Sequence, residues 1–132
     1  MTIFNAQEIA ARRVDMGPLY GALAAAQGEF PEIPKTKTGH GYKYADIADI
    51  LRAVRPILSK NKLAIFQAVE GDRLTTTIAH LSGATLVGTY PLVQDGTGRM
   101  NNIQRIGAAL TYARRYSLTA LLGVAADEDI DA

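Results

Sequence analysis

The chain has 132 residues, which is enough for one compact domain with a single core, and we expect residues 1–132 to form that domain. The formal net charge of +1 by itself argues for no partner. The lack of cysteine excludes a disulfide framework and a thiolate metal site. The lack of any apolar run of roughly 20 residues excludes a membrane-spanning helix. Because the N-terminus also lacks the basic-then-apolar order of a signal peptide, we expect a cytoplasmic protein. We further expect the protein to hold no metal or cofactor.

The N-terminal segment, residues 1–30, is predicted to be helical. A first helix covers residues 6–16, and Gly17-Pro18 ends it. Pro18 suits the first turn of a second helix over residues 19–29, with Leu19, Leu23 and Ala26 on one side. The prolines of "FPEIP" then favour extended chain, and "KTKTGHGYKY" is typical of a loop or of an extra edge strand near residues 35–44.

The segment "ADIADILRAVRPILSKNK" predicts an amphipathic helix over residues 45–62. At about 100° per residue its isoleucines, leucines and valine gather on one side, and Arg52 and Arg55 lie opposite. Asp46 or Asp49 suits the positive end of the helix dipole. This helix is therefore expected to cover the core with one face only.

Three strands follow, over residues 63–69, 73–81 and 84–92. The first two are joined at "EGD" and the next two at Ser82-Gly83, which are tight turn signals, so an antiparallel meander is predicted. Pro91 requires an edge or a strand end. A last helix begins near residue 102 and ends near Gly123. The order predicts an α+β domain in which helices back the sheet, and the two open sheet edges suit contacts between subunits.

Charge is unevenly distributed along the chain. Residues 35–62 carry seven basic and two acidic side chains, and residues 99–115 carry four arginines and no acid. The last six residues, "DEDIDA", carry four acids and form an acidic tail over 127–132. Segregated charge of this kind is compatible with solvated faces and also with nucleic-acid binding.

Most catalytic chemistry lacks its motif here. The sequence has neither a GxxxxGK[ST] phosphate loop nor a GxGxxG fingerprint, and His40 and His80 lack metal-ligand spacing. Carboxylates suit hard cations, so the acidic tail leaves a metal-dependent nuclease open as an alternative. Its residues would be Asp127, Glu128, Asp129 and Asp131. A solvated chain end explains the same cluster more simply.

The last helix places its two adjacent arginines differently. One stripe is expected to pack on the sheet, and its members are Ile103, Ile106, Leu110, Ala113 and Ser117. Arg114 borders this stripe at the sheet margin, where it needs a carboxylate or carbonyl partner. Arg115 joins a second, outward stripe. This stripe could bind phosphates and stack on bases, or it could simply bury tyrosine rings beside snorkelling arginines.

Three segments together resemble the ERF (essential recombination function) family of phage single-strand annealing proteins. They are "YKYADIADILRAVRPILSKNKLAI", "TTTIAHLSG" and "QRIGAALTYARRYSLTALLGVAADEDID". The resemblance implies a β-β-β-α core, sequence-independent binding of single-stranded DNA and ATP-independent annealing in homologous recombination, without catalysis. It also implies a homo-oligomer such as a ring or helical filament, in the cytoplasm of the bacterial host, and contact with a host single-strand-binding protein. A passive single-strand coat that does not anneal is the main alternative.

The candidate DNA-binding residues combine this resemblance with the charge pattern. Lys43, Arg105 and Arg115 are expected to contact phosphates, with Lys35 and Lys37 as supporting cations. Stacking is expected from Tyr112 and Tyr116, and next from Tyr42, while Arg99 and Asn101 are expected to close over the strand. Structural or subunit contacts are expected of Arg114, Asp46 and Arg55.

Overall fold

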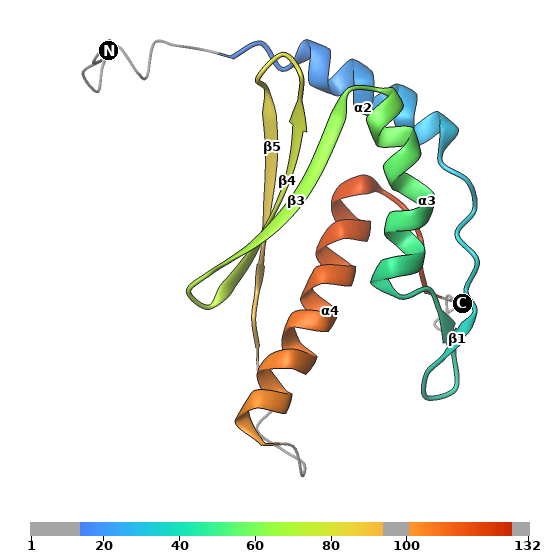
Figure 1. Ribbon diagram of the computed structural model, residues 1–132, viewed down its shortest axis with the longest axis vertical. Helices are drawn as coiled ribbons and strands as arrows, with labels where there is room; N and C mark the ends of the chain where they lie inside the picture. Colours follow the sequence, from blue (N-terminus) through green and yellow to red (C-terminus); the bar gives the residue numbers. More distant parts are fainter. Residues whose placement is uncertain (1–13, 94–100, 128–132) are drawn as a thin grey trace.

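A computed structural model describes residues 14–93 and 101–127, and within them the chain forms an α+β fold, as predicted (Figure 1). Helices α3 and α4 lie beside one face of a three-stranded sheet, and α2 crosses the end of that sheet (Figure 1). The helices are α2 (Gly17–Glu29), α3 (Ile47–Lys60) and α4 (Asn102–Leu122). The strands are β1 (Lys37–Thr38), β2 (Lys43–Tyr44), β3 (Leu63–Glu70), β4 (Arg73–His80) and β5 (Thr85–Pro91).

The sheet is the predicted antiparallel meander, in the order β3-β4-β5. Glu70 pairs with Arg73, so Gly71 and Asp72 form a two-residue turn in which Gly71 takes a φ of 61°. Gly83, at a φ of 98°, makes the second turn. Pro91 is the last residue of the edge strand β5, where its missing N–H removes no bond inside the sheet.

Both long helices begin with a reciprocal capping box. At α3 the Asp46 carboxylate accepts from the Asp49 amide, and the Asp49 carboxylate accepts from the Asp46 amide. Asn101 and Gln104 make the same exchange at α4. These bonds satisfy amides that the first helical turn leaves unpaired. At the other end of α4, Gly123 takes a left-handed φ of 72° and ends the helix as predicted.

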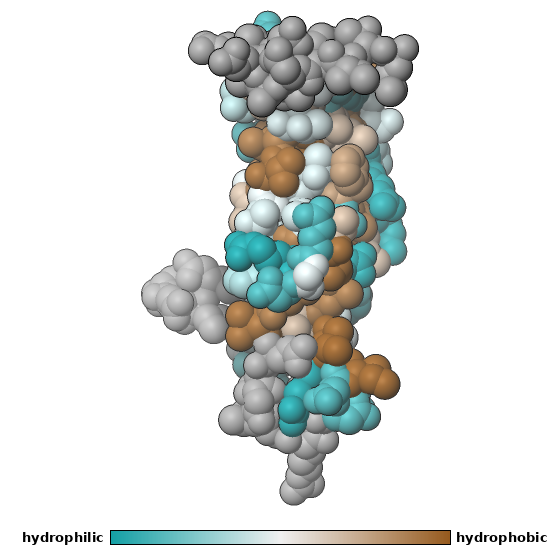
Figure 2. Space-filling view, turned by 90° about the vertical axis from the view of Figure 1, so that its left-hand side faces the viewer, coloured by the Kyte–Doolittle hydropathy of each residue, from teal (hydrophilic) through white to brown (hydrophobic). Residues whose placement is uncertain are grey.

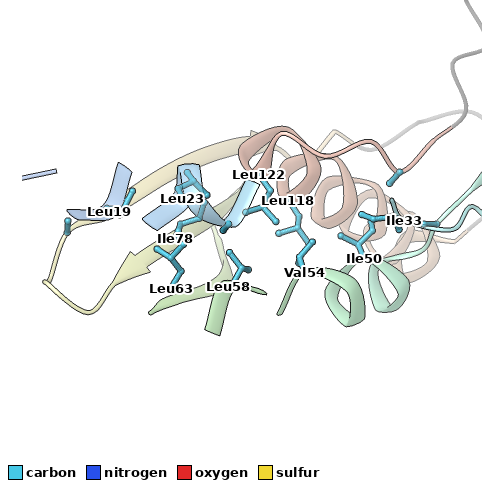
Figure 3. Close-up of a cluster of buried hydrophobic side chains, with 14 residues drawn as sticks. Leu19, Leu23, Ile33, Ile50, Val54, Leu58, Leu63, Ile78, Leu118 and Leu122 are labelled. Atoms are coloured by element: carbon cyan, nitrogen blue, oxygen red, sulfur yellow. The ribbon is translucent and has the colours of Figure 1, made fainter. Parts of the chain in front are cut away.

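One face of the sheet and the inner faces of the helices enclose the core (Figure 3). Helices α2, α3 and α4 and strand β4 contribute buried apolar side chains to it, including Leu19, Leu23, Ile50, Val54, Leu58, Ile78, Leu118 and Leu122. The core holds one buried polar pair, in which the hydroxyls of Thr76 on β4 and Ser117 on α4 lie 2.7 Å apart. Because both residues are buried, this hydrogen bond fixes α4 against the central strand.

The opposite face of the sheet is uncovered in the described structure. Phe66, Thr77 and Val87 lie side by side across the three strands, and Phe66 and Val87 are each 54% exposed. Threonines and alanines occupy most neighbouring positions of this face. Figure 2, which views the sheet side of the molecule, accordingly shows hydrophobic patches separated by polar surface. Because side chains alternate between the two faces of each strand, the residues that do not enter the core form a mixed apolar and polar surface on the other face.

Three expectations differ from the structure or lie outside it. The helix expected over residues 6–16 lies mostly outside the described residues, and residues 14–16 are not helical. The segment 35–44 forms a separate hairpin of β1 and β2 and does not add a strand to the main sheet. Ile103 and Ile106 are 81% and 53% exposed, so the stripe expected to pack on the sheet does so only from its later residues. The first turns of α4 extend beyond β3 and β4 (Figure 1), which a helical wheel cannot show.

Candidate nucleic-acid interface

The β1–β2 hairpin positions two tyrosines above α4. Its turn is closed by the Gly39 amide, which donates to the Tyr42 carbonyl at 2.8 Å. Gly41 takes a φ of 78°, and a β-carbon on Gly39 would lie 2.9 Å from the Tyr42 ring. The two glycines thus allow the turn to fold tightly against Tyr42. The Tyr42 and Tyr44 rings lie with centroids 5.9 Å apart and are tilted by 45°.

Helix α4 adds two more tyrosines and Arg115. The Tyr112 and Tyr116 rings are nearly parallel, at 9°, with centroids 6.1 Å apart. The Arg115 guanidinium carbon lies 4.4 Å from the centroid of Tyr44, 4.9 Å from that of Tyr116 and 5.8 Å from that of Tyr112. Its Nη2 also donates to the Tyr116 hydroxyl at 3.1 Å. We refer to Tyr42, Tyr44, Tyr112 and Tyr116 as the tyrosine cluster.

The segment after α4 returns to the hairpin and covers Arg115. The Ala45 amide donates to the Ala126 carbonyl at 2.7 Å, and Tyr44 and Asp127 form an antiparallel bridge. The Asp127 Oδ1 atom then lies 3.6 Å from Arg115 Nη2, which is an ion pair without a hydrogen bond. Within the described structure, that Oδ1 and the Arg115 Nε are buried without hydrogen-bond partners. One side of the Arg115 guanidinium thus faces the Asp127 carboxylate at ion-pair distance, without a hydrogen bond between them.

Arg115 is 5% exposed, which corrects the expectation of an outward-facing side chain. The helical-wheel prediction assumes that only the sheet packs against α4, whereas the hairpin and the segment near Asp127 pack against a second face of this helix. Burial disfavours the charge, but the Tyr116 hydroxyl and Asp127 raise the pKa of Arg115 above its usual value. Arg115 therefore remains charged beneath the tyrosine cluster.

Three members of the tyrosine cluster, Tyr42, Tyr44 and Tyr112, line a pocket of about 440 Å³, whereas Tyr116, which was expected to stack on bases, does not line it. Its walls come from the hairpin, from the start of α3 and from α4, and they include His40, Tyr42, Tyr44, Tyr112 and Arg115. Tyr112 is 52% exposed, so a ring face of this residue is open to a ligand. We call this the tyrosine pocket. It combines flat aromatic walls, which suit nucleobases, with the buried charge of Arg115 and the carboxylate of Asp46.

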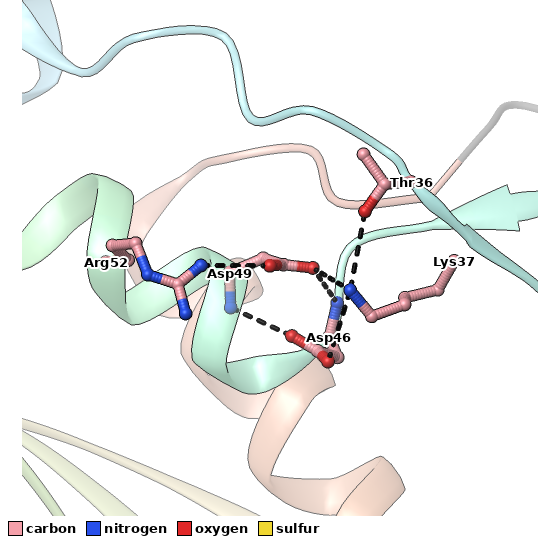
Figure 4. A network of polar contacts seen from close by, with 5 residues as sticks. All are labelled: Thr36, Lys37, Asp46, Asp49 and Arg52. Atoms are coloured by element: carbon pink, nitrogen blue, oxygen red, sulfur yellow. Dashed lines mark hydrogen bonds and ion pairs between the residues drawn. The ribbon is translucent and has the colours of Figure 1, made fainter.

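The predicted lysines lie on and beside the hairpin. Lys37 contacts Asp49 at 3.2 Å and Asp46 at 3.7 Å, and Asp49 also pairs with Arg52 (Figure 4). The hydrogen bond to Asp49 raises the pKa of Lys37. The Lys35 ammonium lies 3.5 Å from the Ile33 carbonyl, and Lys43 is exposed on β2. Lys37 thus has a bridging role between the hairpin and α3, which the sequence did not indicate.

The remaining predicted contacts lie along α4 and α3. Arg105 is partly buried in the first turns of α4, and its Nε has no hydrogen-bond partner in the described part of the chain. Asn101 and Asp46 are the N-caps described above. Arg99 lies outside the described residues. Arg105 and Asn101 therefore lie at the start of the helix that carries Tyr112 and Tyr116, but they do not line the tyrosine pocket.

Arg114 and Arg55 lie on the other side of α4. The Gln67 amide of β3 donates to the Arg114 carbonyl at 3.0 Å, which confirms that Arg114 lies at the sheet margin. Its guanidinium has no carboxylate at ion-pair distance in residues 14–93 and 101–127, so of the two expected kinds of partner, carboxylate or carbonyl, the first is absent there. Together with Arg55 it lines a cleft between α3, β3 and α4.

Sequence reasoning missed two members of the site. Tyr44 was not among the expected contacts, although the "YKY" pattern contains it. Asp127 was considered only as part of an acidic tail, and the structure pairs it with Arg115. Among the described residues there is no group of three His, Asp or Glu side chains that could hold a metal ion. Within the same residues, no helix is long and apolar enough to cross a membrane.

Comparisons with known proteins give one family and one relative. The model of the ERF superfamily matches residues 19–132. The "Essential recombination function protein" of Salmonella phage P22 is 31% identical over 120 residues, covering 85% of this chain and 58% of that protein. The chain therefore spans less than two thirds of the length of this relative. No solved structure matches the chain.

Proposed function

Because the chain belongs to the ERF superfamily, we propose that it binds single-stranded DNA without sequence specificity and anneals complementary strands in phage homologous recombination. Family membership and the phage relative support a recombination role. The binding and annealing steps are our proposal, together with their independence of ATP and their place in the cytoplasm of the bacterial host.

The tyrosine pocket is the observation that carries this proposal. Its volume of about 440 Å³ lies within the range of roughly 300–1,000 Å³ typical of ligand sites. Stacking of a base on an aromatic ring contributes about 1–3 kcal/mol and is insensitive to base identity. Tyr112 offers an open ring face, and Arg115 fixes the rings behind it. A base stacked there would be bound without recognition of its identity.

Cations around the pocket would hold the phosphates. Lys43 and Lys37 lie on the hairpin, Lys35 precedes it, and Arg105 lies near the start of α4. Asn101 and Arg99 would close over the bound strand. In this arrangement phosphate contacts position the strand without reading its sequence.

Annealing then needs no nucleotide hydrolysis. A strand held by its phosphates and by occasional stacked bases presents its remaining base edges to a second strand. Pairing of complementary bases supplies the driving free energy. The exposed edges of β3 and β5 would join neighbouring copies into a ring or helical filament, and a host single-strand-binding protein is a further candidate partner.

The test compares two tyrosines of matched exposure. Tyr112 is 52% exposed in the pocket, and Tyr20 is 54% exposed on α2. Tyr112→Ala is expected to weaken binding of a labelled oligonucleotide about 5- to 160-fold and to slow annealing, in buffer without ATP, whereas Tyr20→Ala changes neither. Lys43→Ala should lower the slope of log K against log salt by about 0.7.

Three outcomes decide the matter. Absence of single-strand binding by the unmodified protein contradicts the proposed function. Equal binding by Tyr112→Ala and Tyr20→Ala contradicts the assignment of the tyrosine pocket. Binding without faster annealing than in protein-free buffer identifies a passive coat instead.

A further inference from the structure

A cleft runs between α3, β3 and α4, on the side of α4 away from the tyrosine pocket. We call it the arginine cleft. Its inner part, of about 320 Å³, is lined by Leu51, Arg55, Phe66, Gln67, Leu110 and Arg114, among others. Its outer part, of about 570 Å³, is also lined by Leu51, Arg55 and Arg114. No acidic side chain lines either part.

Two of the three arginines that line the cleft, Arg55 and Arg114, differ from the third, Arg52, and from the other cations that pair with a carboxylate. Lys60, Arg52 and Arg115 each lie within 4.0 Å of a carboxylate. Within residues 14–93 and 101–127, neither Arg55 nor Arg114 has such a carboxylate. Two like charges at one concave surface raise its positive potential and attract an anion.

The protein fixes Arg114 at this position through its main chain. Gln67 Nε2 donates at 3.0 Å both to the Arg114 carbonyl and to the Thr76 hydroxyl, so the turn of α4 that carries Arg114 is held against the sheet. The guanidinium itself remains available. A planar guanidinium matches two phosphate oxygens, which suits it to a nucleic-acid backbone.

The arginine cleft and the tyrosine pocket meet at one residue of α3. Ile47, at the start of α3, lines both the tyrosine pocket and the outer cleft. From there Leu51, Arg55 and Arg114 lead to the inner cleft, which ends at β3 beside Phe66. The tyrosine pocket and the arginine cleft therefore adjoin at Ile47, near the contact between α3 and α4.

From this adjacency, and from the two arginines that lack a carboxylate partner in the described structure, we infer that the arginine cleft binds the sugar-phosphate backbone of the same DNA strand whose base occupies the tyrosine pocket. The inference rests on the proposed function. Arg55 and Arg114 contact phosphates, and the leucines of the cleft pack against sugars. These arginines thereby gain a role beyond structural or subunit contacts.

Salt dependence of binding measures this directly. Each phosphate contact to a single strand contributes about 0.7 to the slope of log K against log salt. We expect Arg55→Gln and Arg114→Gln each to lower that slope by about 0.7, and the double variant by about 1.4, in fluorescence anisotropy with a labelled oligonucleotide. Arg114→Lys should keep the slope, because it keeps the charge.

Arg73→Gln is the matched control, since it removes the same charge at the β3–β4 turn, where Arg73 donates to Thr89. It should leave the slope unchanged. Melting temperatures close to that of the unmodified protein confirm that the variants fold, and the single variant Arg55→Gln serves as the readout if a variant at Arg114 does not.

The outcomes separate the two proposals. If the unmodified protein binds DNA and the double variant shows the same slope and affinity, the path through the arginine cleft is wrong and the proposed function survives. If the double variant instead loses binding of poly-glutamate alone, the occupant is an acidic polypeptide, which also overturns the inference. If the unmodified protein binds no single strand, both proposals fail.

Discussion

Replacement of Arg115 by methionine tests whether its guanidinium holds the tyrosine cluster together. Two rings lie within 5 Å of the guanidinium carbon, at 4.4 Å and 4.9 Å, and each contact contributes about 1 kcal/mol. The hydrogen bond to the Tyr116 hydroxyl contributes about 1 kcal/mol more. Methionine recovers part of this through apolar burial and sulfur–ring contacts. We expect a net loss of about 2 kcal/mol.

Urea unfolding followed by circular dichroism measures this loss, and a thermal scan should show a melting temperature lower by about 7 °C. Arg52→Met is the control, because the Arg52 side chain is 75% exposed and its ion pair lies at the surface. It should leave the free energy of unfolding nearly unchanged. If Arg115→Met is as stable as the unmodified protein, the guanidinium does not organise the cluster, and our account of the pocket is refuted.

Three further predictions concern other parts of the molecule. Ser117→Ala should cost about 1 kcal/mol in urea unfolding, because it removes one of two hydrogen bonds of the buried Thr76 hydroxyl; a neutral effect would contradict the role of this bond. Burial opposes ionisation of Asp49, but the hydrogen bond from Lys37 and the capping bonds lower its pKa. The contribution of this carboxylate to the free energy of unfolding is therefore present above about pH 4 and is lost as the pH falls through the lowered pKa. Asp49→Asn should therefore flatten the fall of melting temperature between about pH 5 and 3, and an unchanged profile would count against the lowered pKa. Gly39→Ala should displace the Tyr42 ring and weaken single-strand binding, whereas Gly28→Ala, whose β-carbon meets nothing within 4 Å, should not; equal affinities would show that the Tyr42 position is unimportant.

The elements of the main sheet and the helices could be predicted because their signals are local. The turns at Gly71 and Gly83, the caps at Asp46 and Gly123 and the apolar stripe of α3 each depend on a few adjacent residues. Short-range stereochemistry decides such features, so the sequence shows them directly. The meander followed because strands joined by tight turns pair with their neighbours.

The candidate site was harder to predict because distant segments build it. Burial of Arg115 depends on the hairpin around Tyr44 and on Asp127, which pair with each other across most of the chain. A helical wheel ranks side chains by direction alone, so it placed Arg115 outside. The same reasoning placed Ile103 on the sheet, although α4 starts beyond the strands that it covers. Whether the arginines bind DNA stays a prediction.

The tie between the hairpin and the end of the chain also has a consequence for the order of folding. Strands β3, β4 and β5 pair only with their neighbours along the chain, so they can form early at a small cost in loop entropy. The contact of Ala45 with Ala126 can close only after α3, the sheet and α4 have docked. We therefore expect the tyrosine pocket to form last during folding and to open first in local unfolding. In hydrogen exchange, the amide of Ala45 should exchange before those of β4.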